Sequence, residues 1–74
     1  MEQTKDIMTI VGNNVKRYRE EAGYSQSYLG GCFGATSSWI KMIEGGMADF
    51  KLSTLAKLAE HLDVKVIDLV EDWE

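Results

Sequence analysis

The chain has 74 residues, which fits a single domain, and its formal net charge is −4. Apolar residues make up 45% and charged residues 27%, as in ordinary soluble proteins, and no apolar run approaches the roughly 20 residues of a membrane-spanning helix. The lone Cys32 excludes an intrachain disulfide and argues against a structural zinc site, and the charged N-terminus does not resemble a signal peptide. These features predict a cytoplasmic protein.

The negative charge is concentrated near the C-terminus. Residues 60–74 contain one base, Lys65, and six acids, which are Glu60, Asp63, Asp68, Glu71, Asp72 and Glu74. The first 59 residues hold seven bases and six acids, so their net charge is +1. This part of the chain is neutral enough to approach phosphate, but it lacks the strongly basic face of a tight non-specific nucleic-acid binder.

Apolar residues at helical spacing predict a first helix that ends at Gly23. Its stripe consists of Ile7, Val11, Val15, Tyr18 and Ala22. A second helix is predicted over 26–33 after the N-cap Ser25, and a third over 37–44 after the N-cap Thr36. Glycines at 34 and 45–46 end these two helices.

Two further helices are predicted, at about 52–62 and at about 66–70. Because the connections between the five helices are short, we expect an all-α fold, a compact five-helix bundle. It would form one domain over 1–74, with a core at about 7–70 and an acidic tail at 71–74.

The stretch from Ser25 to Gly46 has the layout of a helix-turn-helix. Two steeply crossed helices need a small residue at the centre of the crossing, and Gly30 fills this place. The turn needs a residue that tolerates positive φ, which Gly34 supplies. On the third helix, Ser37, Ser38 and Lys41 are expected on the outer face, where side chains can reach base edges in the DNA major groove.

Three segments together resemble the Cro/repressor, or Xre-like, family of helix-turn-helix domains: VGNNVKRYREEAGYSQSYL, FGATSSWIKMIEGG and LSTLAKLAEHLDVKVIDL. The resemblance covers about residues 11–70 and implies a bundle of the lambda-repressor-like type. It also implies a sequence-specific DNA-binding transcriptional regulator, a repressor of phage or bacterial type. Such a protein reads double-stranded DNA as a homodimer, with the third helix in the major groove and the fifth helix region at the dimer contact.

The resemblance assigns roles by position. Ser37, Ser38 and Lys41 match positions that contact bases, and Gln26 matches one that contacts phosphate. Further candidates for phosphate contacts are Thr36, Lys51, Lys16 and Arg17, with a solvated helix face as the alternative for the last two. Arg19 and Glu44 match a partly buried ion pair with a structural role, which joins the first helix to the end of the third.

Three features depart from the family pattern, and Trp73 in the acidic tail is a further residue with two possible roles. Gly30 and Gly31 stand together inside a helix, where the family usually has alanine and a polar residue. Trp39 replaces a small or polar residue and either packs between helices or contacts DNA. The loop MADFK has one lysine and one acid, Asp49. Trp73 either packs on the bundle or covers a dimer contact.

A second hypothesis is a protein-interaction module with this fold, such as an anti-repressor or antitoxin, with weak or no DNA binding. The acidic tail would then bind a basic protein partner or mask the groove-binding face. An enzyme is not expected, because His61 and Cys32 each stand without a nucleophile–base set. The sequence also predicts no cofactor, no metal ion and no membrane contact.

Overall fold

The computed structural model describes residues 6–49 and 51–73, in which the chain forms five helices and no strand. These are α1 (Ile7–Ala22), α2 (Gln26–Cys32), α3 (Ser37–Glu44), α4 (Leu52–Leu62) and α5 (Val66–Val70). The all-α, five-helix prediction is confirmed. The predicted α2 was one residue too long, because Phe33 already occupies its C-cap position. Glu74, the last residue of the predicted tail, lies outside the described residues.

The helix ends follow from local hydrogen bonding. The Ser25 hydroxyl accepts from the Tyr28 backbone N–H at 2.9 Å, and the Thr36 hydroxyl accepts from that of Trp39 at 3.4 Å. Each cap satisfies a donor that the first helical turn leaves unpaired. Gly34 opens the turn between α2 and α3 with a φ of +67°, a conformation that side-chain-bearing residues rarely adopt.

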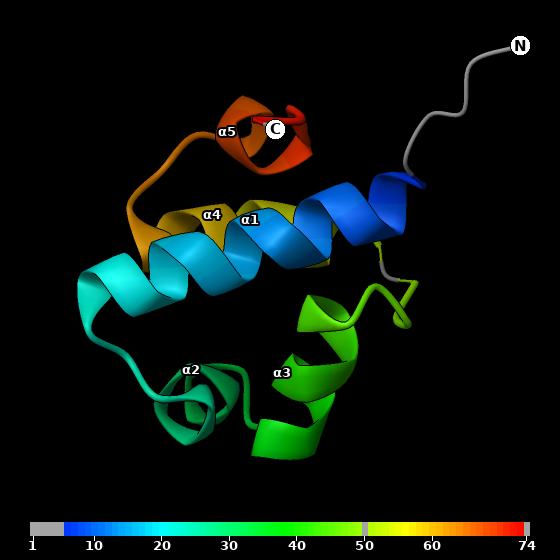
Figure 1. Cartoon of the computed structure of the whole chain (residues 1–74). Coiled ribbons are helices and arrows are strands. Elements are labelled where there is room, and N and C mark those ends of the chain that lie inside the picture. The colour runs from blue at the N-terminus through cyan, green and yellow to red at the C-terminus, as the bar shows by residue number, and fades with distance from the viewer. Residues whose placement is uncertain (1–5, 50, 74) are drawn as a thin grey trace, which may run out of the picture.

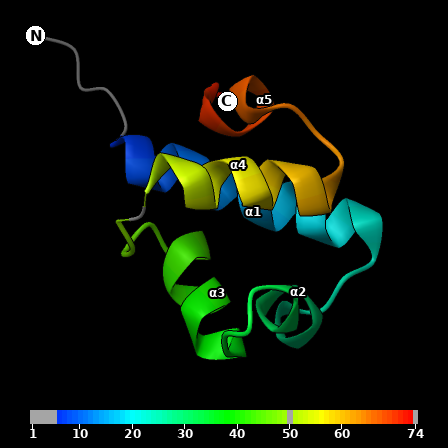
Figure 2. The same cartoon turned by 180° about the vertical axis from the view of Figure 1, so that it is seen from behind.

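Helix α1 runs through the middle of the molecule (Figures 1 and 2). In both views α2 and α3 lie on one side of α1 and α5 lies on the other, with α4 packed along α1. All five helices contribute to the apolar core, which consists of Val11, Val15, Leu29, Ile40, Ile43, Ala48, Leu55, Leu58, Ala59, Leu62 and Leu69. The helix-turn-helix and the C-terminal tail are therefore on opposite sides of α1.

Two glycines let α3 approach its neighbours closely. A Cβ atom on Gly12 of α1 would overlap the carbonyl oxygen of Ile43. A Cβ atom on Gly30 of α2 would lie 2.6 Å from the carbonyl oxygen of Thr36, closer than real Cβ contacts. Gly30 therefore stands at the helix crossing, as its position in the sequence predicts.

Candidate nucleic-acid interface

Helix α3 buries one side and exposes the other. Ile40 and Ile43 are fully buried in the core. The exposed residues of the helix and its C-cap are Ser38, Lys41, Met42 and Gly45. At about 100° per residue, these four positions fall within an arc of about 100° around the helix axis. We call this surface the α3 outer face.

Two of the three predicted base-contacting residues, Ser38 and Lys41, lie on the α3 outer face. Ser37 is half-buried and stands at its edge. Sequence reasoning missed Met42, whose 49% exposure brings an apolar side chain onto the same face. The available signal was its spacing, because Met42 follows Ser38 by four residues and so lies one turn further along the helix.

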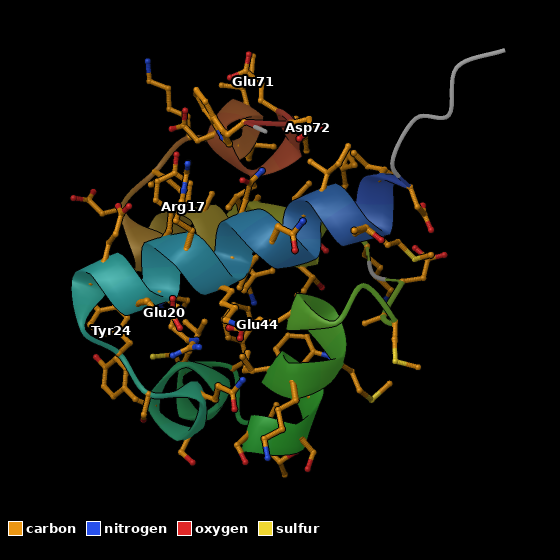
Figure 3. All side chains as sticks on the ribbon, in the orientation of Figure 1. Arg17, Glu20, Tyr24, Glu44, Glu71 and Asp72 are labelled. Atoms are coloured by element: carbon orange, nitrogen blue, oxygen red, sulfur yellow. The ribbon has the colours of Figure 1, made fainter. Side chains whose placement is uncertain are left out.

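An ion pair joins α1 to the end of α3. Arg19 Nε donates to Glu44 Oε2 at 2.5 Å, and Arg19 Nη2 donates to Glu44 Oε1 at 3.1 Å. Both side chains are almost completely buried, with 10% and 5% of their surface exposed. The hydrogen bonding of Arg19 to the Glu44 carboxylate is the main cause that raises the pKa of Arg19. Figure 3 shows Glu44 in the space between α1 and the helix-turn-helix.

The same carboxylate also holds Gln26. The Gln26 Nε2 group donates to Glu44 Oε1 at 3.0 Å, so the side chain at the start of α2 belongs to the ion-pair network. An amide NH₂ group has two hydrogens, and the second remains able to donate to a phosphate. The predicted phosphate contact of Gln26 is therefore compatible with its position.

The other predicted phosphate ligands are placed differently. Lys51 is exposed at the N-cap of α4, and the hydroxyl of Thr36 caps α3. Lys16 is exposed on α1, in helical register with Gly12 and Arg19, which both contact α3. Thr36 lies within the helix-turn-helix, Lys16 lies on the adjoining helix α1, and Lys51 lies at the start of α4.

Arg17 requires a correction. Its guanidinium carbon lies 4.7 Å from the centroid of the Tyr18 ring and 5.2 Å from that of Trp73, and its Nε atom is buried. Figure 3 places Arg17 on the side of α1 that carries Glu71 and Asp72, away from α3. The Arg17 side chain is therefore not the freely solvated one that was the alternative prediction, whereas a phosphate contact from it stays a prediction. Contact with the tail, which is distant in the sequence, determines its position.

Residues 71–73 of the tail are fixed to the α1–α5 side. The buried side chain of Asn14 donates to the carbonyl oxygens of Leu69 at 2.9 Å and of Glu71 at 2.7 Å. Trp73 Nε1 donates to the Asp68 carbonyl oxygen at 3.1 Å. Trp73 thus packs on the bundle, one of its two predicted roles. The alternative prediction that the tail masks the groove-binding face is wrong for these residues.

The other residues that the sequence analysis discusses, Trp39, His61 and Cys32, lie in packed or surface positions. Trp39 is partly buried, with its ring centroid 5.2 Å from that of Phe33, which is the interhelical placement. The His61 ring packs against Phe33 at 5.1 Å. Cys32 is a free, exposed thiol, and it is the main cause that raises the pKa of the neighbouring Tyr28.

Across residues 6–49 and 51–73, no group of three or more His, Cys, Asp or Glu side chains could hold a metal ion. Within the same ranges, no helix is both long enough and apolar enough to span a bilayer.

The described residues form a helix-turn-helix fold like that of the Cro/repressor, or Xre-like, domains that the sequence resembles. The close approach of α2 to the turn before α3 at Gly30, the glycine-opened turn and the Arg19–Glu44 pair match the features from which the sequence predicts this type of domain. Among curated proteins, the HTH-type transcriptional regulator SinR of Bacillus subtilis (strain 168) is 33% identical over 64 residues. These residues are 85% of this chain but 58% of SinR, so the chain spans little more than half of that relative. No model of a known protein family matches the sequence.

Solved structures share the fold. The restriction-modification controller protein C.AhdI from Aeromonas hydrophila is 27% identical with a TM-score of 0.76, covering 84% of this chain and 94% of its own. The hypothetical transcription factor NHTF from Neisseria has 23% identity and a TM-score of 0.85, covering 99% and 86%. Hydroxypropylphosphonic acid epoxidase from S. wedmorenis has 23% identity and a TM-score of 0.86 over 92% of this chain, but this match covers 36% of that enzyme. The likeness to NHTF and to the epoxidase concerns the fold alone.

Proposed function

We propose that this chain is a sequence-specific DNA-binding transcriptional regulator in which α3 enters the major groove. The observation that carries this proposal is the α3 outer face, which is exposed, bears Ser38 and Lys41, and lies across α1 from the acidic tail. A helix fits the width of the major groove, where each base pair presents its own pattern of donors and acceptors. The similarity to SinR, a transcriptional regulator, and to C.AhdI, a controller protein, supports the same class.

Base contacts are assigned to Ser37, Ser38 and Lys41. The Lys41 ammonium can donate to guanine O6 and N7, whereas serine hydroxyls accept or donate and so discriminate less. Lys41 is therefore the main polar determinant of sequence preference in this proposal.

Phosphate contacts are assigned to Gln26, Thr36, Lys16 and Lys51. Two of these are cationic, and α3 adds the backbone N–H groups of its first turn apart from that of Trp39, which already donates to the Thr36 hydroxyl. Because each neutralised phosphate adds about −0.9 to the slope of log affinity against log salt, so small a set implies a shallow salt dependence.

We further propose that the protein is a homodimer and a repressor, and that it reads a palindromic site. Val66 and Ile67 on α5 are 40% and 54% exposed, which leaves an apolar surface on this short helix for a second copy. Two-fold symmetry would then place the two α3 helices in successive major grooves. The mass in solution tests the dimer: a monomer at concentrations that saturate DNA would refute it.

The proposal is tested by selecting bound fragments from a random duplex pool at low salt, followed by titration of one selected site. Lys41→Ala should weaken binding about 5- to 150-fold, which corresponds to the roughly 1–3 kcal/mol of a good base contact. Lys57→Ala, an exposed lysine on α4, is the matched control and should change binding little. Absence of any selected site, together with equal behaviour of the two variants, would count decisively against DNA reading by α3.

A second candidate function is a protein-interaction module. Glu71 and Asp72 are both exposed beside Trp73, which favours a basic partner at the tail. Replacing both acids by their amides should abolish such binding and change DNA affinity little at physiological salt. If instead DNA selection fails and the wild type alone retains a protein partner, the second candidate replaces the first.

A further inference from the structure

An apolar side chain stands on the surface that the proposed function places against DNA. Met42 is 49% exposed, although methionine is a residue that folding usually buries. It follows Lys41 directly and lies one helical turn beyond Ser38. The α3 outer face is therefore not uniformly polar, because it carries the Met42 side chain between Ser38 and the end of the helix.

The apolar surface continues past the end of α3. Gly45, the next residue of the face, has no side chain, and Met47 occupies the space beside it. Met47 Cγ lies 3.8 Å from where a Cβ atom on Gly45 would be, and the Met47 backbone N–H donates to the Met42 carbonyl at 2.9 Å. Met47 is 76% exposed. Met42 and Met47 together form what we call the methionine strip.

We infer that the methionine strip reads thymine through its 5-methyl group, with Met42 as the main contact. This inference rests on the proposed function. Among the four bases, thymine alone presents a methyl group in the major groove, and apolar side chains recognise it by contact. Methionine suits this task because it is unbranched and adapts its shape to the surface it meets. The neighbouring Lys41 prefers guanine oxygen and nitrogen acceptors, so the two residues divide the reading between a polar and an apolar signal.

The test uses deoxyuridine, which has the hydrogen-bonding groups of thymine but lacks the methyl group. A site is first selected from a random duplex pool with the intact protein. Each thymine of the half-site is then replaced in turn by deoxyuridine, and affinities are compared. For wild type we expect one position at which binding weakens about fourfold, which corresponds to about 0.8 kcal/mol for one buried methyl-sized group.

The variants identify the side chain responsible. Met42→Ala should bind the thymine and deoxyuridine duplexes with equal affinity at that position, and Met42→Leu should restore most of the difference. Ile7→Ala, which removes an apolar side chain that is 52% exposed on α1, should keep the full difference. Thermal unfolding of each variant checks that the fold is intact.

The outcomes separate the two proposals. Absence of any selected site overturns both the proposed function and this inference. Selected sites without thymine, or equal wild-type affinity for thymine and deoxyuridine duplexes at every position, overturn the inference alone. A difference that persists in Met42→Ala also overturns it, because another group would then read the methyl. If another protein covers the methionine strip and the difference in affinity between thymine and deoxyuridine duplexes stays unchanged, the inference is likewise refuted.

Discussion

Gly30 and Gly31 are neighbours in α2, yet replacing each by alanine should have different effects on the free energy of unfolding. Both lie inside the same helix, so both substitutions gain the same helix-propensity contribution of about 0.8–1.0 kcal/mol. They differ in what the new Cβ atom meets. At Gly31 nothing lies within 4 Å, whereas at Gly30 the Thr36 carbonyl oxygen and carbon lie at 2.6 and 2.9 Å.

The overlap at Gly30 is with backbone, so a flexible side chain cannot relieve it. Moving the turn before α3 should cost about 1–3 kcal/mol, the usual range for overpacking a core. Gly31→Ala is therefore expected to stabilise the protein by about 0.8–1.0 kcal/mol. Gly30→Ala should range from neutral to about 2 kcal/mol destabilising, which is the overpacking cost less the propensity gain. The difference between the two variants is the overpacking cost itself.

Urea unfolding followed by circular dichroism measures both variants, with an unchanged m-value as the check that the unfolded state is the same. In thermal unfolding each kcal/mol should shift Tm by about 4–8 °C for a domain of this size. Gly31→Ala serves as the internal control for Gly30→Ala. Equal stabilisation by the two substitutions would refute the close α2–α3 crossing, because it would show that space for a Cβ atom exists at Gly30.

Three further predictions concern contacts described above. Glu44→Ala leaves the Arg19 guanidinium buried without its partner, so urea unfolding should show a loss of about 3–5 kcal/mol in the free energy of unfolding. A double-mutant cycle with Arg19→Met should show strong coupling between the two residues. Additive effects of the two substitutions would refute the pairing. Asn14→Ala removes both donors to the end of α5 and should cost about 1–3 kcal/mol, with a change in Trp73 fluorescence that a purely local effect would not give. The pKa of Tyr28 is raised mainly by the electrostatic effect of the nearby Cys32, so Cys32→Ser should bring it closer to 10.0 in a carbon-13 NMR titration of the tyrosine ring. Because this pKa is raised in the folded state, the contribution of Tyr28 to stability should be lost as pH rises above about 10.

The sequence predicted the helices well because their determinants are local. Ser25 and Thr36 each cap a helix within three residues, and the spacing of buried residues such as Val11 and Val15 sets the inner face of α1. The position of Gly30 was also predictable, since any steep helix crossing requires a small residue there. These features need no knowledge of distant parts of the chain.

The site was less predictable because it depends on contacts between distant residues. The sequence predicted Arg17 as a surface cation, but in the fold its guanidinium lies over the ring of Trp73 in the tail. Gln26 matched a phosphate-binding position, but nothing in the sequence indicated its hydrogen bond to Glu44. The helical spacing places Met42 on the exposed face of α3, but sequence reasoning considered only the polar residues of that face as base contacts.

The acidic tail bears on whether a chain with a net charge of −4 can approach DNA. Two side-chain donors from Asn14 hold the last carbonyls of α5, so Glu71 and Asp72 are fixed on the far side of α1 from α3. The molecule measures 21 Å along each of its two shorter axes, whereas the Debye length at physiological ionic strength is about 8 Å. Repulsion between these acids and a duplex at α3 is therefore largely screened. Their amide variants should change DNA affinity little at physiological salt and increase it at low salt, where screening is weaker; an equal gain at both salt concentrations would place the tail near the DNA and refute the argument.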